Sequence, residues 1–355
     1  MPEHDTPNEL QSGFVTPDTK GKDLGPTSET GYASFLAHEH PETEQIGDDT
    51  YMLSLPLPVG GGPITSTLCY VMAGPHGEAH LVDPGWNSDE DWNRLTSALK
   101  EWGLGPVKSV FVTHLHIDHI GMAERIRQEY GATMIMGEAE WALFQSIPDQ
   151  AAMNARYDSW GVPFDKRPVM PSDLWHESQV PVAPPDQLVR EGDKLDMGRP
   201  MEVMVSPGHT EGSLTLRDDD RRLIMPGDNV LPHIHPGLGL DYDPDGDPLG
   251  DYLDAIESMN AYDGYEVLPG HGFRFAHLAL RNDQTVAHHL RRTKQVVKAL
   301  ETMPADVSVW ELASKLHWSH GWDNLEGYFL NSALQQTSMH LRFVRNPERS
   351  AKWLA

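Results

Sequence analysis

The sequence predicts an α+β fold in which helices cover mixed β-sheets and a small helical domain follows. Residues 46–280 alternate between short apolar runs typical of strands and segments with helical spacing, with local hairpins between them. After about residue 280 only helical patterns follow, whereas residues 1–45 are polar, contain proline and lack periodicity. We therefore expect a flexible N-terminal segment (1–45), a main domain (46–280) and a helical C-terminal domain (281–355).

The first half of the main domain combines strand and helix patterns. Strands are predicted at 50–58 and 107–114, a hairpin at 66–85, and helices at 89–103 and 121–131. Both helical patterns end in glycine, Gly103 and Gly131, which can take the left-handed conformation that closes a helix. Such an alternation is typical of a sheet that is covered by helices.

Residues 141–188 interrupt this pattern with a stretch rich in proline, methionine and tryptophan. Loops of this length within compact domains are usually lids or binding loops, so we expect a lid insertion here. The stretch contains the tryptophans Trp141, Trp160 and Trp175. They either shape an apolar pocket or hold the loop against the body of the protein.

Strand patterns return at 200–230 and 265–272, and both segments carry a histidine in a loop. The C-terminal part is predicted to be helical: residues 290–300 have helical spacing, and Ser308 with Glu311 is the signal of a capping box. The last helix has an apolar stripe formed by Leu330, Leu334, Leu341 and Val344.

The composition restricts both partners and chemistry. The chain of 355 residues has 27 Lys and Arg against 53 Asp and Glu, a formal charge of −26. Such a surface repels phosphate backbones and disfavours nucleic acid as a partner. No secretion signal pattern opens the chain and no long apolar run occurs, which predicts a cytoplasmic protein without membrane spans. With Cys69 as the single cysteine, a bound metal needs nitrogen and oxygen ligands.

The stretch THLHIDHIG (113–121) directly follows an apolar run typical of a buried strand. It places His114, His116, Asp118 and His119 at a strand-to-helix turn, which can aim consecutive side chains at one point. Imidazole and carboxylate groups are good ligands for zinc, iron and manganese. A lone histidine is more often a core or surface residue, but four ligand-type side chains this close together predict a metal site.

Three further ligand-type residues each follow an apolar strand pattern. SPGHTEG presents His209, MPGDNV presents Asp228 and LPGHG presents His271. Glycine beside each of them allows a sharp turn. Each loop alone would be an ordinary turn, but together with the cluster at 113–121 they supply enough ligands for two metal ions.

This ordered set of motifs resembles the metallo-β-lactamase superfamily of hydrolases, over about residues 50 to 275. LVDPG at Asp83 resembles the first motif of that family. The resemblance implies an αββα sandwich with two divalent metal ions at one edge of its sheets, zinc first, with manganese or iron as alternatives. Asp228 would bridge the ions, and Asp83 would orient the site without binding metal. One ion would take His114, His116 and His209, and the other would take Asp118, His119 and His271.

The same resemblance implies that a metal-bridging hydroxide attacks the substrate. Asp118 would also relay a proton, and His233, His235 or a lid residue would protonate the leaving group. Asp228 stands where the antibiotic-degrading members carry cysteine, which argues against a β-lactam substrate. The acidic surface and the aromatic lid favour a small-molecule ester, lactone, thioester or activated aryl ester or ether.

The C-terminal helices resemble, more weakly, a winged-helix-like appendage found on one branch of the superfamily that includes single-strand ribonucleases. The basic residues of these helices either form a solvated face or contact RNA. The residues are Arg291, Arg292, Lys294, Lys298, Arg342 and Arg345. A metal-dependent ribonuclease or phosphodiesterase is therefore one alternative function, and an iron-dependent oxidoreductase of the same fold is another. The apolar residues of the lid and the C-terminal helices are compatible with a homodimer.

Overall fold

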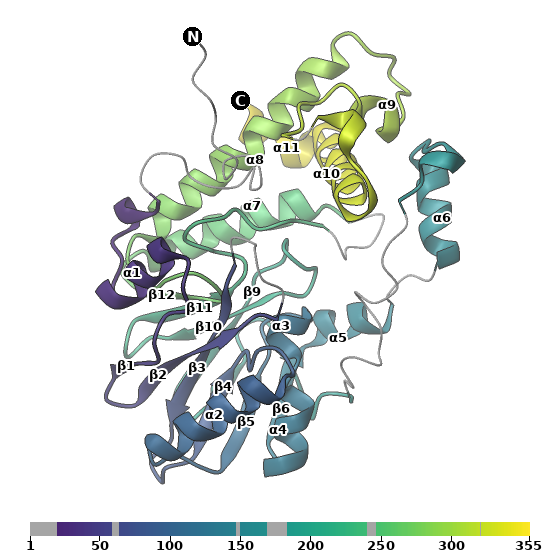
Figure 1. Cartoon of the computed structure of the whole chain (residues 1–355). Helices are drawn as coiled ribbons and strands as arrows, with labels where there is room; N and C mark the ends of the chain where they lie inside the picture. Colours follow the sequence, from purple (N-terminus) through teal and green to yellow (C-terminus); the bar gives the residue numbers. More distant parts are fainter. Residues whose placement is uncertain (1–19, 59–63, 147–149, 169–182, 240–245, 320) are drawn as a thin grey trace.

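The computed structural model describes residues 20–58, 64–146, 150–168, 183–239, 246–319 and 321–355. Two β-sheets pack face to face, and helices lie on the outer side of each sheet (Figure 1). The chain thus has the predicted α+β fold with an αββα layer order. Its C-terminal helices lie beside the second sheet.

The first sheet has seven strands in the order β1-β2-β3-β4-β5-β6-β7. Neighbours from β1 to β4 run antiparallel, and neighbours from β4 to β7 run parallel. The predicted hairpin at 66–85 is formed by β3 and β4. The strands are β1 (Glu44–Gly47), β2 (Thr50–Pro56), β3 (Ser66–Ala73), β4 (Ala79–Val82), β5 (Val107–Phe111), β6 (Thr133–Gly137) and β7 (Gln187–Val189).

The second sheet has five strands in the order β12-β11-β10-β9-β8. Neighbours from β8 to β11 run antiparallel, whereas β11 and β12 run parallel. The strands are β8 (Lys194–Asp196), β9 (Pro200–Val205), β10 (Leu214–Asp218), β11 (Leu223–Gly227) and β12 (Glu266–Pro269).

Helices connect the strands and cover both sheets. Those of the first half are α2 (Asp89–Glu101), α3 (Ile117–Ile120), α4 (Ala123–Tyr130) and α5 (Glu138–Gln145). α2 and α4 correspond to the predicted helices, and Gly131 closes α4 with a positive φ of 67°. On the second sheet lie α7 (Pro248–Met259), the 3-10 turn η3 (Asn260–Tyr262) and α8 (Leu278–Leu300).

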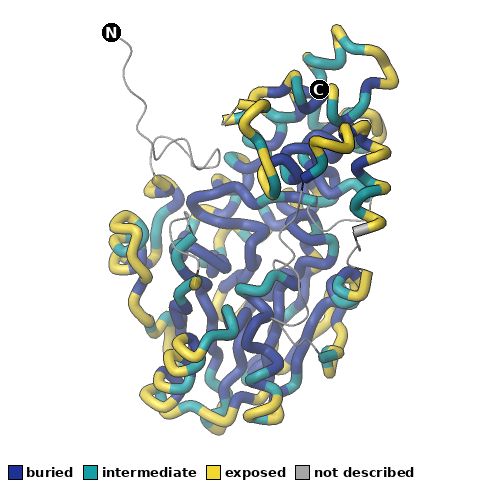
Figure 2. The backbone as a smooth tube through the Cα atoms, turned by 45° about the vertical axis from the view of Figure 1, so that its right-hand side comes forward, coloured by how far each residue is buried: buried dark blue, intermediate teal, exposed yellow. Residues whose placement is uncertain are grey.

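The buried apolar residues fill three layers: between α2, α4 and the first sheet, between the two sheets, and between the second sheet and the helices beyond it. β3 shows how the sequence builds the first two layers. Leu68 and Tyr70 face the second sheet, whereas Cys69 and Val71 face the helices, because successive strand side chains point to opposite faces. Figure 2 shows the strands mostly buried and the exposed residues on their connections and along the helices.

The described part of the N-terminal segment, residues 20–45, is folded onto the body rather than flexible. It forms η1 (Lys22–Leu24), α1 (Glu29–Ala37) and the start of β1. Leu24 is fully buried, and Glu44 accepts a hydrogen bond from Arg274 at 2.8 Å. A few apolar anchors and one ion pair thus order a segment whose polar composition predicted a tail.

The C-terminal domain is helical, as predicted. It contains α8, α9 (Val309–Ala313), η4 (Trp322–Asn324), α10 (Gly327–Arg345) and α11 (Pro347–Leu354). The capping box at Ser308 and Glu311 is present at the start of α9. α8 begins at Leu278, so the predicted boundary at residue 281 falls inside its first turn. Among the described residues after β12 there is no strand, and therefore no wing hairpin.

The described parts of the insertion at 141–188 contain the end of α5, α6 (Gln150–Ser159), η2 (Phe164–Lys166) and the start of β7, so the predicted end at residue 188 falls inside a strand of the first sheet. Trp160 is 9% exposed, and its carbonyl accepts a hydrogen bond from the Trp310 N–H. The Tyr157 hydroxyl donates to Asn331 Oδ1 at 2.9 Å. Trp160 thus pins the insertion to the helical domain, and Trp175 lies outside the described residues. None of the described helices is long and apolar enough to cross a bilayer.

Candidate metal centre

The cluster of ligand-type residues predicted at 113–121 lies directly beyond β5. His114 and His116 stand in the turn after the strand, and Asp118 and His119 stand in the short helix α3, which begins after His116. The strand fixes the start of the turn and the helix fixes its end. The four side chains are therefore presented from one compact segment.

The three distal ligands stand on loops of the second sheet. His209 lies between β9 and β10, Asp228 follows β11, and His271 follows β12. Because β11 and β12 are parallel, their carboxyl ends open at the same edge of the sheet. This topology brings residues that are far apart in the sequence to the turn after β5.

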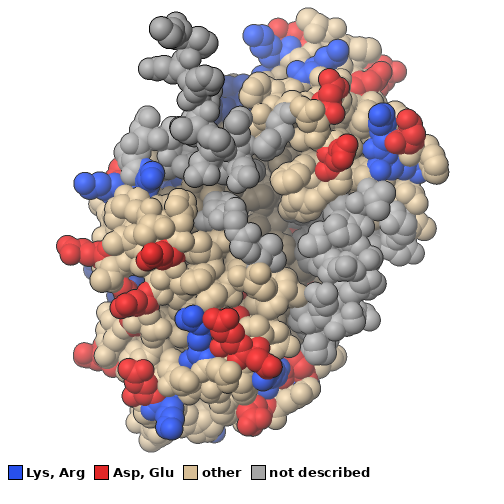
Figure 3. All heavy atoms as spheres, in the orientation of Figure 1, with Lys and Arg blue, Asp and Glu red and all other residues tan. Residues whose placement is uncertain are grey.

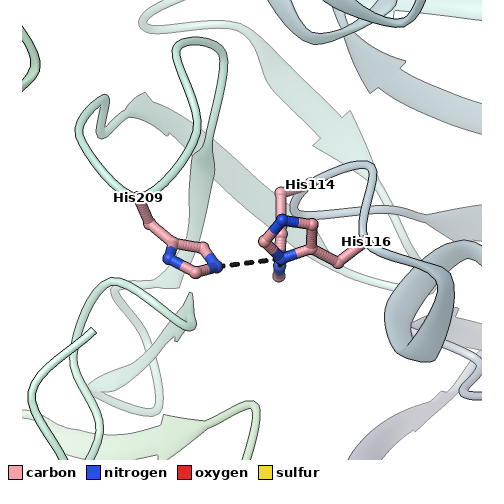
Figure 4. A group of neighbouring side chains, drawn as sticks. All are labelled: His114, His116 and His209. Carbon is pink, nitrogen blue, oxygen red and sulfur yellow. Dashed lines mark hydrogen bonds between the residues drawn. The ribbon is translucent and has the colours of Figure 1, made fainter. Parts of the chain in front are cut away.

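His114, His116 and His209 form the three-histidine group, in which three ring nitrogens converge. Nδ1 of His116 lies 3.0 Å from Nε2 of His114 and 3.0 Å from Nε2 of His209 (Figure 4). All three ligand atoms lie within 4.8 Å of one another. This spacing fits one cation bound by three imidazoles.

Asp118, His119 and His271 form a second group, the Asp118 group. Nε2 of His271 lies 3.2 Å from Nε2 of His119 and 3.3 Å from Oδ2 of Asp118. Asp228 lies between the groups: Oδ1 is 3.4 Å from Nε2 of His119, and Oδ2 is 3.9 Å from Nε2 of His209. All seven predicted ligands are therefore brought together, and Asp228 lies within 3.9 Å of a ring nitrogen of each group.

The ring nitrogens that face away from the centre have partners of their own. Nδ1 of His209 lies 2.8 Å from the Gly237 carbonyl oxygen, and Nδ1 of His271 lies 2.8 Å from the Ser66 carbonyl oxygen. A histidine whose Nδ1–H donates to a carbonyl presents the lone pair of Nε2 in a fixed direction. These contacts orient both rings for metal binding.

Asp83 likewise holds the turn after β5 and orients a histidine in α3. Its Oδ1 accepts from the Thr113 N–H at 2.8 Å, and its Oδ2 accepts from the Thr113 hydroxyl at 2.7 Å and lies 2.9 Å from Nδ1 of His119. The Thr113 hydroxyl also lies 2.9 Å from Nδ1 of His114. Asp83 has a positive φ of 52°, which is uncommon for a residue with a side chain.

The charges divide the centre into two halves. Burial and the neighbouring imidazoles lower the pKa of His114 well below its ordinary value and the pKa of His209 to about 4, which favours the neutral imidazole that binds metal. In the Asp118 group burial also opposes charge, but Asp228 and Asp118 outweigh it and raise the pKa of His271 to about 10. That half of the centre attracts cations.

The residues present fit divalent metal ions. Oδ1 of Asp228 is buried and has no hydrogen-bond partner, although buried polar atoms nearly always have one. Nε2 of His119 lies 3.4 Å from this oxygen, and the ring nitrogens of neighbouring histidines, 3.0–3.2 Å apart, are close enough to share one cation. A largely buried set of nitrogen and oxygen groups, in which four of the histidines are held by partners outside the centre, is the arrangement expected around a bound metal.

The two histidines predicted to act as acids lie in different surroundings. His233 is buried beside Gly272, the neighbour of the ligand His271, and its ring lies 4.8 Å from that of Phe35. His235 packs on α8 instead: its ring stacks on His288 at 4.1 Å, and its Nδ1 lies 3.2 Å from the Thr285 hydroxyl. Burial and nearby Arg281 lower the pKa of His235 far below its ordinary value.

Sequence reasoning missed two residues that hold the ligand loops. One is Thr113, which links Asp83 to His114. The other is Glu140, whose fully buried carboxylate accepts hydrogen bonds from both loops that carry the three-histidine group. Neither has a motif of its own, although Thr113 directly precedes the histidine cluster.

The chain is similar to a known protein family and to individual proteins of known name. The family model described as the metallo-beta-lactamase superfamily matches residues 62–271, a range that contains all seven predicted ligands. The hydroxyacylglutathione hydrolase GloC of Haemophilus influenzae is 27% identical over 201 residues, which cover 55% of this chain and 80% of that protein. The atrochrysone carboxyl ACP thioesterase of Aspergillus fumigatus is 23% identical over 253 residues, which cover 69% of this chain and 64% of that protein.

A solved structure resembles almost the whole chain. The beta-lactamase domain protein from Burkholderia ambifaria has a TM-score of 0.71 at 22% sequence identity, and the match covers 97% of this chain and 94% of that chain. At this level of identity the likeness concerns the fold. It extends over the C-terminal helices as well as the two sheets.

Proposed function

Because the chain belongs to the metallo-β-lactamase superfamily and is a hydrolase-type enzyme, we propose that it hydrolyses small-molecule thioesters with two zinc ions. The observation that carries this proposal is the convergence of six buried or half-buried candidate ligands around Asp228, all from segments that directly follow strands. Three imidazoles on one side and one carboxylate with two imidazoles on the other favour zinc.

In this proposal the ligands divide as the geometry groups them. The three-histidine group would hold one ion, the Asp118 group would hold the other, and Asp228 would contact both. A pair of divalent ions bound there would polarise the scissile carbonyl and lower the pKa of bound water toward about 7. The role of the protein is to keep the ligand atoms in place through the partners behind them.

Two residues are assigned proton transfers. Asp118 would take up the proton that the attacking water loses, and its side chain, 22% exposed, is more open to solvent than that of Asp228 at 9%. His233 would donate a proton to the leaving group, and its place beside Gly272 next to the ligand His271 supports this role. His235 is the weaker candidate because its contacts are with α8.

The choice of thioester rests on the relatives and on the surface. Two similar proteins are named as a hydroxyacylglutathione hydrolase and an acyl-carrier-protein thioesterase. In the face shown in Figure 3, most of the described side chains are uncharged, and the charged ones lie in small scattered groups. Three of the six basic C-terminal residues donate hydrogen bonds to backbone carbonyls of this chain, namely Arg292, Arg342 and Arg345. These contacts support a structural role for the basic residues over RNA binding.

The test joins metal content with turnover. Protein purified without chelators should contain about two zinc ions per chain, because a two-metal hydrolytic site needs both ions. It should release free thiol from an acyl thioester faster than it hydrolyses the oxygen ester with the same acyl group. A chelator should abolish this activity and zinc should restore it. Full turnover without metal would overturn the proposal, and so would a single iron per chain accompanied by oxygen uptake.

A further inference from the structure

Glu140 is a buried acidic residue close to the metal centre, without being one of its ligands. It lies in the first turn of α5, directly after β6, and is 0% exposed. An ionised carboxylate buried in protein is costly unless hydrogen-bond donors surround it. The identity of those donors shows what the residue does.

The donors come from the two loops that carry the three-histidine group. The Leu115 N–H donates to Oε1 at 2.6 Å, and Leu115 stands between the ligands His114 and His116. The Gly212 N–H donates to Oε2 at 3.0 Å. The hydroxyl of Thr210, which follows His209, lies 3.0 Å from Oε1 and 2.9 Å from Oε2. One carboxylate therefore ties the two ligand loops together.

The backbone is shaped for this contact. A Cβ atom on Gly212 would lie 2.1 Å from the Glu140 nitrogen, closer than any real contact. A Cβ atom on Gly137 would lie 3.1 Å from the Gly212 carbonyl oxygen. Glycine at both positions lets the loop after His209 pack directly on the start of α5. The hydrogen bonds and the close approach are independent observations of the same contact.

We propose that Glu140 is the positioning residue of the three-histidine group. Its carboxylate fixes the loop of His114 and His116 against the loop of His209, and so sets the spacing of the three ring nitrogens. An ionised carboxylate only accepts hydrogen bonds, so both of its oxygens can pair with the two backbone N–H groups and the hydroxyl. In a Gln side chain the NH2 group would replace one of these oxygens and would face an N–H or hydroxyl donor without accepting from it. This inference rests on the proposed function, since it assigns Glu140 to one of the two proposed zinc ions.

The Asp118 group has a different anchor. His119 is oriented by Asp83, and His271 by the Ser66 carbonyl, so neither of these contacts involves Glu140. Loss of the Glu140 carboxylate should therefore act on one ion and spare the other. This selectivity separates a positioning role from a general contribution to folding.

The test is zinc affinity, measured by competition with a chromophoric chelator, for the wild type, Glu140→Gln and a matched control, Glu124→Gln. Glu124 is 7% exposed and accepts from Arg127 and Gln128 on its own helix, α4. We expect E140Q to bind one zinc ion about 10–100-fold more weakly and the other as the wild type does. E124Q should bind both normally. The visible spectrum of the cobalt-loaded protein should change in E140Q and not in E124Q.

A second variant keeps the test decisive if E140Q fails to fold. Thr210→Val removes one donor to the carboxylate and should weaken the same ion by a smaller factor. The role of Glu140 would be overturned if E140Q bound both zinc ions with wild-type affinity and had an unchanged cobalt spectrum. If E140Q is unfolded, the same result in T210V would overturn it. Equal weakening of both ions would also overturn it, because that indicates a general structural role. A wild type without zinc would instead overturn the proposed function.

Discussion

Oδ2 of Asp83 lies 2.9 Å from Nδ1 of His119, and Nε2 of the same ring lies 3.2 Å from Nε2 of His271. A single carboxylate behind the turn after β5 therefore decides which nitrogen of His119 faces the metal centre. The other oxygen of Asp83 accepts from the Thr113 N–H, so the backbone of the turn is fixed by the same group. The positive φ of Asp83 places its carboxylate there.

Asp83→Asn should weaken zinc binding by about 10–100-fold, because a partner that orients a ligand histidine is replaced by an amide that can also donate. The loss should concern the Asp118 group first, since His119 is its member. Zinc affinity by chelator competition measures the effect. Asp89→Asn is the matched control, because Asp89 is 90% exposed and its salt bridge with Arg125 lies on the surface. Equal zinc affinity in D83N and D89N would contradict the prediction.

Asp228→Ala should reduce thioester hydrolysis by more than about 100-fold, because loss of a ligand should exceed the effect of losing an outer partner. Oδ2 of Asp228 lies 3.3 Å from Nε2 of His271 and 3.9 Å from Nε2 of His209, so both ions should bind more weakly. His209→Ala should affect only the ion of the three-histidine group. Elemental analysis of both variants after the same dialysis tests the difference. A D228A protein that keeps two zinc ions would contradict the bridging assignment.

The convergence of the candidate ligands could be predicted because each of them lies just beyond a strand and stands in a short motif with glycine or another ligand-type residue. The alternation of Leu68, Cys69, Tyr70 and Val71 likewise matches a strand buried on both faces. The capping box at Ser308 was readable because both of its partners lie within one turn. In all these cases the information is local.

What could not be predicted depends on contacts between distant residues. In the sequence Glu140 looks like an ordinary acidic residue in the first turn of a helix. Its burial becomes evident only in the folded protein, where the loop at Gly212 packs directly against it. The order of residues 20–45 depends on Arg274, which lies 230 positions from its partner Glu44. Local composition carries no trace of such a partner.

Arg199→Met should lower the free energy of unfolding by about 3 kcal/mol, because it leaves a buried carboxylate with less compensation. Arg199 is 6% exposed; its Nε donates to Asp218 at 2.5 Å, and its Nη2 donates to Thr50 of the other sheet at 2.8 Å. Urea unfolding measures the loss. Arg94→Ala, which breaks an exposed pair with Glu90, should cost about 0.5 kcal/mol or less. Similar losses in the two variants would contradict a special role for the buried pair.

Asp91 should make the stability of the protein depend on pH. Burial raises the pKa of its carboxyl to about 6, although the Ser88 hydroxyl donates to it at 2.9 Å. Because the pKa of an Asp carboxyl in the unfolded chain is about 4, the folded state binds this proton more tightly than the unfolded state does. The resulting stabilisation is complete below about pH 4 and disappears as the pH rises through about 6.

Asp91→Asn removes this titration while leaving an oxygen that can accept from Ser88. Between pH 5 and pH 7.5, the free energy of unfolding of the wild type should therefore fall relative to that of the variant by about 1 kcal/mol. Urea titrations of both proteins in the same chelator buffer measure the difference, and pH effects of the metal centre cancel in it. Parallel pH profiles for the two proteins would mean that Asp91 is already ionised at pH 5, with its charge stabilised inside the fold.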